Sequence, residues 1–127
     1  MSRNRLGTVL TDVGFTLARN PDTVRAPDIA FIRQERLPAN PRGFCNGPPD
    51  LAVEVLSGDD RRSEVAAKIE DYLAHGVRAV VVIDPDAATV EVVRRGRPGT
   101  VLAAPDARVE LSDVVPGFGC DVREILD

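Results

Sequence analysis

Short runs of apolar residues, separated by turn-forming segments, recur along this sequence of 127 residues. Runs of this length that are rich in valine and isoleucine are typical of β-strands. They predict one strand or hairpin arm over residues 7–17, and further strands over 28–33, 51–56, 78–85, 88–96 and 100–105. Residues 34–49 contain four prolines and two glycines. We therefore expect an irregular surface loop there.

Residues 57–76 have the periodicity of an amphipathic helix. Four apolar residues of this stretch fall on one helical face, namely Val65, Ile69, Tyr72 and Leu73. Asp59 or Asp60 is suited to cap the start of the helix, and Gly76 is suited to end it. We expect the apolar face to cover a β-sheet.

The order of these elements indicates how the strands are arranged. The helix lies between strands 51–56 and 78–85, so those two strands are expected to be parallel neighbours in one sheet. Strands 88–96 and 100–105 flank a turn, and we expect them to form an antiparallel hairpin. The sheet is therefore predicted to be mixed.

The C-terminal segment 114–127 contains a Pro-Gly turn and is expected to form a short helix or extended tail. Its packing residues are expected to be Phe118, Val122, Ile125 and Leu126. Hydrophobic residues make up 43% of the chain, enough for one core. These features predict a single domain over residues 1–127, of the α/β class, with a central mixed sheet and a flanking helix.

Composition and charge narrow the classes of function. The net charge of -4 argues against a protein that coats nucleic acid non-specifically. It does not exclude a local basic face, for which the short arginine runs are candidates. His75 is the only histidine, and Cys45 and Cys120 lack metal-ligand spacing, so a Cys-His metal site is excluded. We expect His75 at the negative end of the helix. No apolar run has the length of a membrane span, and we expect a cytoplasmic protein without membrane contact.

Glu54 stands out because it interrupts an apolar strand. Its neighbours Leu51, Ala52, Val53, Val55 and Leu56 leave the strand without a polar face. An ionised carboxylate removed from water costs several kcal/mol unless a cation, hydrogen-bond donors or a metal compensate it. Either the strand is less buried than its composition suggests, or Glu54 has a partner.

Lys68 is a candidate partner. It is the only lysine beside fifteen arginines, and an ammonium is a compact charge whose pKa shifts more readily than that of a guanidinium. Helical geometry places Lys68 on the margin of the apolar face, from which it can lean toward the sheet. The alternative is a surface ion pair with Glu64, four residues earlier on the same helix.

Asp28 is the third candidate residue. It follows a proline at the start of a strand, where an aspartate is often only a turn or cap residue. The same interpretation is open for Asp50, which follows Pro49. If the strand that follows Asp28 neighbours the strand of Glu54, the two carboxylates converge. Two adjacent carboxylates repel unless a cation lies between them, and such oxygen ligands suit Mg²⁺ or Mn²⁺. A nearby lysine could then orient water or offset charge on a phosphate.

Four segments together resemble the Uma-two family of endonuclease-like proteins, in the PD-(D/E)XK nuclease superfamily. They are RAPDIAFIR, PPDLAVEVLSGDDRRSEVAAKIEDYLAHGV, VVVIDP and VPGF, in this order, from about Val24 to the C-terminus. The resemblance implies a restriction-endonuclease-like mixed sheet with flanking helices, and metal-dependent hydrolysis of DNA. It makes Asp28 and Glu54 metal ligands. The superfamily lysine two residues after the glutamate is Leu56 here, and in this family its role moves to the helix, where this chain has Lys68.

The resemblance also indicates where this chain departs from its family. Family members usually begin with several tens of residues that this chain lacks, so the expected fold is N-terminally truncated. A truncated sheet exposes edges and apolar surface that a second subunit would bury, and we expect a homodimer. Two functions remain open: a Mg²⁺- or Mn²⁺-dependent DNA endonuclease, and a catalytically degenerate nuclease fold that acts in dimerisation or partner binding.

Overall fold

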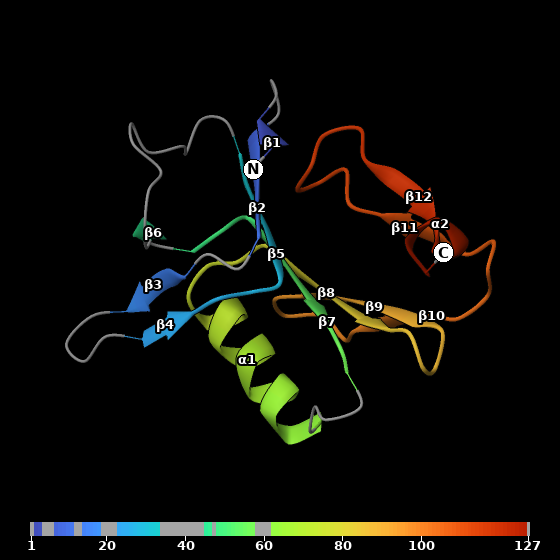
Figure 1. The fold of residues 1–127 in the computed structure, drawn as a ribbon, viewed down its shortest axis with the longest axis horizontal. Coiled ribbons are helices and arrows are strands. Elements are labelled where there is room, and N and C mark those ends of the chain that lie inside the picture. Colours follow the sequence, from blue (N-terminus) through green and yellow to red (C-terminus); the bar gives the residue numbers. More distant parts are fainter. Residues whose placement is uncertain are drawn as a thin grey trace.

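The structure is a computed structural model, and it describes residues 2–3, 7–11, 14–18, 23–33, 45–46, 48–57 and 62–126. Within these residues the main sheet has seven strands. In spatial order they are β1 (Ser2–Arg3), β2 (Gly7–Thr11), β5 (Ile29–Arg33), β7 (Leu51–Val55), β8 (Ala79–Asp84), β9 (Thr89–Arg94) and β10 (Thr100–Leu102). Strands β7 and β8 are parallel and the other neighbours are antiparallel. The predicted mixed α/β sheet is thus confirmed (Figure 1).

Helix α1 (Arg62–Ala74) connects the parallel strands β7 and β8 and packs on one face of the sheet. Tyr72 is fully buried there, and Val65, Ile69 and Leu73 pack against the same core, as their periodicity predicted. The helix ends where Gly76 adopts a φ of 104°, a conformation that costs glycine little. Val77 N–H then donates to the Tyr72 carbonyl at 3.0 Å. The predicted cap residues Asp59 and Asp60 lie outside the described residues.

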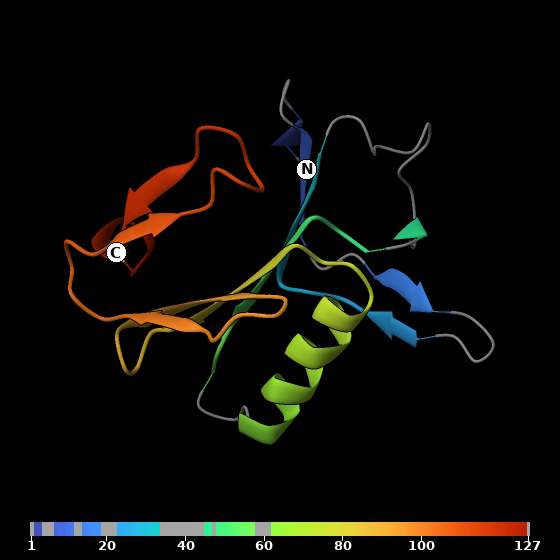
Figure 2. The ribbon, with the colours of Figure 1, turned by 180° about the vertical axis from the view of Figure 1, so that it is seen from behind.

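The opposite face of the sheet is covered by the C-terminal elements β11 (Arg108–Glu110), β12 (Gly119–Asp121) and α2 (Val122–Leu126). They lie at the far end of the molecule from β3 and β4 (Figures 1 and 2). Alternate strand residues separate the two cores: Val80 and Val82 face α1, whereas Ala79 and Val81 face the C-terminal elements. Each face of the sheet therefore has its own hydrophobic core.

One predicted core residue of the C-terminal segment is exposed. Phe118 is 42% exposed, so its predicted packing role is wrong, whereas Val122 is buried and Ile125 and Leu126 pack against the core. The cause is a tight turn, in which Phe118 N–H donates to the Val115 carbonyl at 2.9 Å. The turn directs Phe118 outward, and the predicted short helix is confirmed as α2.

The N-terminal segment differs from the single strand or hairpin arm that was predicted over 7–17. It contains two strands in different sheets, β2 in the main sheet and β3 (Phe15–Ala18) in a small sheet with β4 (Thr23–Arg25) and β6 (Cys45–Asn46). Residues five apart on one regular strand point to opposite faces. Leu10 and Phe15 nevertheless share one core, because the chain leaves the main sheet between them.

Most of the predicted loop over 34–49 lies outside the described residues, but its residues 45–46 form β6, which pairs in parallel with β3. The predicted hairpin of β9 and β10 is confirmed by its antiparallel register. Among the described helices, neither is long and apolar enough to cross a membrane.

Candidate active site

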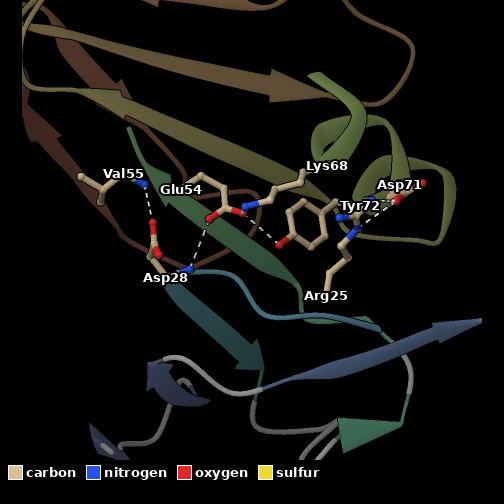
Figure 3. Close-up of polar contacts among 7 residues, drawn as sticks. All are labelled: Arg25, Asp28, Glu54, Val55, Lys68, Asp71 and Tyr72. Atoms are coloured by element: carbon tan, nitrogen blue, oxygen red, sulfur yellow. Dashed lines mark hydrogen bonds and ion pairs between the residues drawn. The ribbon is translucent and has the colours of Figure 1, made fainter. Parts of the chain in front are cut away.

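The pairing of β5 with β7 brings Asp28 beside Glu54. The strands are antiparallel, with Ile29 opposite Val53, so the residue before Ile29 lies next to the residue after Val53. Two hydrogen bonds connect the ends of these strands: Asp28 N–H donates to Glu54 Oε2 at 3.3 Å, and Val55 N–H donates to Asp28 Oδ2 at 2.7 Å (Figure 3). The strand of Asp28 thus neighbours the strand of Glu54, as the predicted convergence of the two acids requires.

Glu54 points toward α1 because side chains alternate along β7. Ala52 belongs to the core beneath α1 and Leu51 and Val53 to the opposite core, so Glu54 shares the face of Ala52. Its exposed fraction is only 5%. The strand is thus as buried as its composition suggested, and Glu54 must be compensated.

Two side chains of α1 compensate Glu54 from above. Tyr72 Oη–H donates to Glu54 Oε1 at 3.1 Å, and Lys68 Nζ lies 3.6 Å from the same oxygen (Figure 3). Lys68 and Tyr72 are one helical turn apart, which places them on the same side of the helix. The partners of the buried acid are an amide, a phenol and an ammonium.

The ion pair of Lys68 decides between its two predicted partners. Among the described residues, Lys68 forms its ion pair with Glu54 of the underlying sheet and not with Glu64 of its own helix. The Lys68 side chain is 39% exposed, whereas that of Glu54 is 6% exposed. Lys68 therefore contacts both the buried acid and solvent.

Burial controls the proton affinity of this cluster. Loss of hydration raises the pKa of Glu54 above its ordinary value, and the positive charge of Lys68 opposes that rise only in part. Burial and the neighbouring Glu54 charge raise the pKa of Tyr72 well above its ordinary value. The phenol therefore keeps its proton and acts as a hydrogen-bond donor to the carboxylate.

The oxygen atoms of Asp28 and Glu54 fit a hard divalent cation. Oδ2 of Asp28 accepts the Val55 amide, Oε1 of Glu54 is held by α1, and Oε2 of Glu54 accepts the Asp28 amide. A carboxylate oxygen that accepts one hydrogen bond keeps a further lone pair, which can bind a cation. In the described part of the chain, no group of three or more acidic, histidine or cysteine side chains comes together. A cation held by two carboxylates would complete its coordination with water or substrate oxygens, as Mg²⁺ commonly does.

A second ion pair borders the cluster. Arg25 on β4 donates through Nε and Nη2 to Asp71 Oδ2, at 2.9 and 2.7 Å (Figure 3). It ties the small sheet to α1 beside Tyr72. The sequence singled out neither Arg25 nor a polar role for Tyr72, which was placed only on the apolar face. Its spacing of four residues from Lys68 is the one signal that could have suggested it.

Two other polar residues have structural roles away from this cluster. Asp50, at the opposite end of β7, is 1% exposed, accepts Arg33 N–H at 2.7 Å and lies 3.4 Å from Arg78 Nε. Its role is thus larger than that of the turn residue considered from sequence. His75 Nδ1 lies 2.7 Å from the Asp71 carbonyl at the end of α1, which agrees with the predicted helix-end position.

The flank of α1 that faces β8, β9 and β10 carries a different surface. A groove there has an apolar floor that includes Val65, Ile69 and Val82, and it also contains three acids, Asp84, Asp86 and Glu91. Lys68 and Arg25 lie on the flank that faces β5 and β4 instead. On that flank the two basic side chains are paired with acids, Lys68 with Glu54 and Arg25 with Asp71.

Comparisons with known proteins were made for the whole chain. The sequence model of the Uma2 (Uma-two) family, described as "Putative restriction endonuclease", matches residues 1–123, so the resemblance begins well before Val24. The fold is similar to the crystal structure of a "putative nuclease belonging to DUF820" from Anabaena variabilis, with a TM-score of 0.85 and 26% identity. That match covers 96% of this chain and 69% of the other. No curated protein matched the sequence.

Proposed function

Because this chain belongs to the Uma2 family, we propose that it is a metal-dependent endonuclease that hydrolyses phosphodiester bonds in DNA. Its family and fold are those of restriction-endonuclease-like nucleases. The observation that carries the finer proposal is the cluster at the end of β5 and β7. There, Asp28 donates its main-chain N–H to Glu54, and Glu54 pairs with the ammonium of Lys68.

In this proposal Asp28 and Glu54 hold Mg²⁺ or Mn²⁺. When bound, such a cation polarises a phosphate oxygen and lowers the pKa of a coordinated water. The two carboxylates would fix the position of that charge where β5 begins and β7 ends, and their own mutual repulsion favours cation binding. Glu54 brings rigidity because it is buried and bonded to α1, and Asp28 is held by two hydrogen bonds to β7, one from its own N–H and one from Val55 N–H.

Lys68 is the proposed catalytic group of the helix. Its ammonium is partly exposed and lies on the boundary between the buried acid and solvent. From this position it can orient the attacking water or offset the negative charge that develops on the phosphate. An arginine would deliver a planar, forked group to the same place, which is a different hydrogen-bonding geometry.

The distribution of charge indicates the side from which DNA would approach. The groove on the β8–β10 flank of α1 contains Asp84, Asp86 and Glu91 and would repel a phosphate backbone. On the opposite flank, Lys68 and Arg25 balance the charges of Glu54 and Asp71, so a phosphate backbone meets less repulsion there. We therefore place the DNA over the β5 side of the helix, where the cluster of Asp28 and Glu54 also lies.

A second candidate function is a degenerate nuclease fold that acts in dimerisation or partner binding. The observation that favours it is exposed apolar surface beside the cluster: Ile29 is 37% exposed and Val55 is 40% exposed. Ile29 lies opposite Val53 on the neighbouring strand, so both exposed side chains are on the face that points away from α1. A second copy of the chain would bury them, and a homodimer is part of either proposal.

One assay separates the two functions. Supercoiled plasmid is incubated with the purified protein and Mn²⁺ or Mg²⁺, beside Glu54→Gln and a matched control, Glu64→Gln, which alters an exposed glutamate of α1. The endonuclease proposal predicts nicking by the wild-type protein and by Glu64→Gln, and none by Glu54→Gln. Nicking that persists in Glu54→Gln, or that is absent from the wild-type protein at millimolar metal, would refute it.

A further inference from the structure

Two side chains of α1 converge on a single oxygen atom of Glu54. Tyr72 donates to Oε1 at 3.1 Å, and Lys68 Nζ lies 3.6 Å from it (Figure 3). The other oxygen, Oε2, accepts the main-chain N–H of Asp28 at 3.3 Å. The helix therefore engages one side of the carboxylate, and the other side faces Asp28.

The two helix residues differ in the freedom that their side chains have. Tyr72 is fully buried in the core beneath α1, where its ring is fixed by packing, and a phenol ring has only two side-chain torsions. Lys68 is 39% exposed and has a flexible four-carbon chain. If Lys68 turns to a substrate phosphate, the hydrogen bond from Tyr72 still holds Glu54 Oε1.

We propose that Tyr72 is a positioning residue, which holds the Glu54 carboxylate through its hydroxyl so that Oε2 stays turned toward Asp28 and the cation. The inference rests on the proposed function, because it assigns Tyr72 to cation binding at the same site. The two residues of α1 then have different roles: Tyr72 supports cation affinity through Glu54, and Lys68 supports the rate of hydrolysis. A tyrosine that only filled the core would not show this division.

The first test is Tyr72→Phe, which removes the hydroxyl and keeps the ring. Second-sphere groups of this kind typically change metal affinity by about 10- to 100-fold, so calorimetric titration should show Mn²⁺ binding weakened by roughly that factor. The nicking rate at saturating Mn²⁺ should return to within a few-fold of wild type. Lys68→Ala should show the reverse, with a lost rate and little change in Mn²⁺ affinity.

Ile69→Val is the matched control. It shortens a neighbouring residue of the same helix that packs in the same core and is outside the Glu54 contacts. This control loosens α1 slightly and should leave Mn²⁺ affinity unchanged. An equal loss of affinity in Ile69→Val and Tyr72→Phe would assign the effect to packing and overturn the inference.

A spectroscopic test uses the wild-type fold directly. Tyr72 is the only tyrosine and the chain has no tryptophan, so intrinsic fluorescence reports this residue almost alone. A carboxylate that accepts a phenol hydrogen bond quenches tyrosine emission. Emission should therefore increase in Glu54→Gln, and it should change during a Mg²⁺ titration of the wild-type protein with the midpoint that calorimetry gives. Emission that responds to neither change would overturn the inference.

The outcomes separate this inference from the proposed function. If the wild-type protein binds Mn²⁺ and does not nick DNA, the endonuclease proposal fails, and a weakened affinity of Tyr72→Phe still supports the positioning role. If the protein nicks DNA and Tyr72→Phe binds Mn²⁺ like wild type, the positioning role alone fails. If the wild-type protein binds no divalent cation, both fail.

Discussion

Replacement of Glu54 by glutamine should stabilise the metal-free protein above neutral pH. The pKa of Glu54 is raised by burial, so the folded state binds this proton more tightly than the unfolded state does. For an acid with a raised pKa, the free energy of unfolding falls as the pH rises from the unfolded pKa through the folded pKa, and then levels off. The ionised form of Glu54 therefore destabilises the folded protein above neutral pH.

The contacts of Glu54 give the expected size of this effect. Burial of the charge costs several kcal/mol. Hydrogen bonds to a charged group return about 1.5–3 kcal/mol each, and the partly exposed Lys68 adds only about 0–1 kcal/mol. Burial raises the pKa of Glu54 although Lys68 and the hydrogen bonds lower it, so the cost of burial exceeds what these partners return. We expect Glu54→Gln to gain on the order of 1 kcal/mol at pH 8, because glutamine removes the charge and can still accept from Tyr72.

Urea denaturation between pH 5 and pH 8, in buffer that contains a metal chelator, measures this prediction. Only the difference between wild type and Glu54→Gln is interpreted, since other groups that titrate in this range affect both proteins equally. The difference should favour the variant increasingly as the pH rises, and Glu64→Gln should show no such trend. A wild-type protein that becomes more stable than Glu54→Gln as the pH rises would refute the reasoning, because it would mean that the partners overcompensate the burial.

Four further results are expected. Lys68→Ala should lose metal-dependent nicking while its free energy of unfolding changes by no more than about 1 kcal/mol, measured by plasmid cleavage and urea denaturation. Mn²⁺ at 100 times its dissociation constant should add about 2.7 kcal/mol of stability, and Asp28→Asn should abolish most of the thermal shift. Asp50→Ala should cost about 3 kcal/mol in urea denaturation, because it removes a buried partner of Arg33 N–H and Arg78. Val55→Lys should convert the proposed dimer to a monomer in sedimentation velocity, and an unchanged oligomer would exclude that face.

The elements that sequence predicted well are those whose pattern is local. The α1 face of Val65, Ile69 and Tyr72 follows from helical periodicity alone, and the core assignment of these residues is confirmed. The parallel pairing of β7 and β8 follows from the helix between them. Residues 7–17 were misjudged because an alternating pattern does not show where a chain leaves one sheet for another. Phe118 was misjudged for a related reason, since the turn that directs it outward depends on hydrogen bonds with Leu111 and Val115.

The candidate site required non-local information that only part of the sequence carried. Glu54 was recognisable because a charge among apolar residues demands compensation, and the identity of its neighbour Asp28 depended on whether β5 pairs with β7. The sequence offered Lys68 two acidic partners, Glu54 and Glu64. The position of Glu54 under the helix selects between them. The polar role of Tyr72 was not recognised, because packing fully explains an aromatic residue on an apolar helical face and its spacing from Lys68 was the one contrary signal.

The buried position that makes Glu54 costly to the fold would also suit it to bind the proposed cation. In water, a carboxylate would be hydrated and mobile, and a cation would have to displace that hydration and fix the side chain. At the end of β7, the fold has already removed the water and fixed the carboxylate between Asp28 N–H and Tyr72 Oη, so the cost of organising the ligand is met during folding. The stability gained by Glu54→Gln and the cation affinity lost by Tyr72→Phe would then be two measurements of one arrangement. If the first is seen without the second, Glu54 is buried and fixed for some purpose other than cation binding.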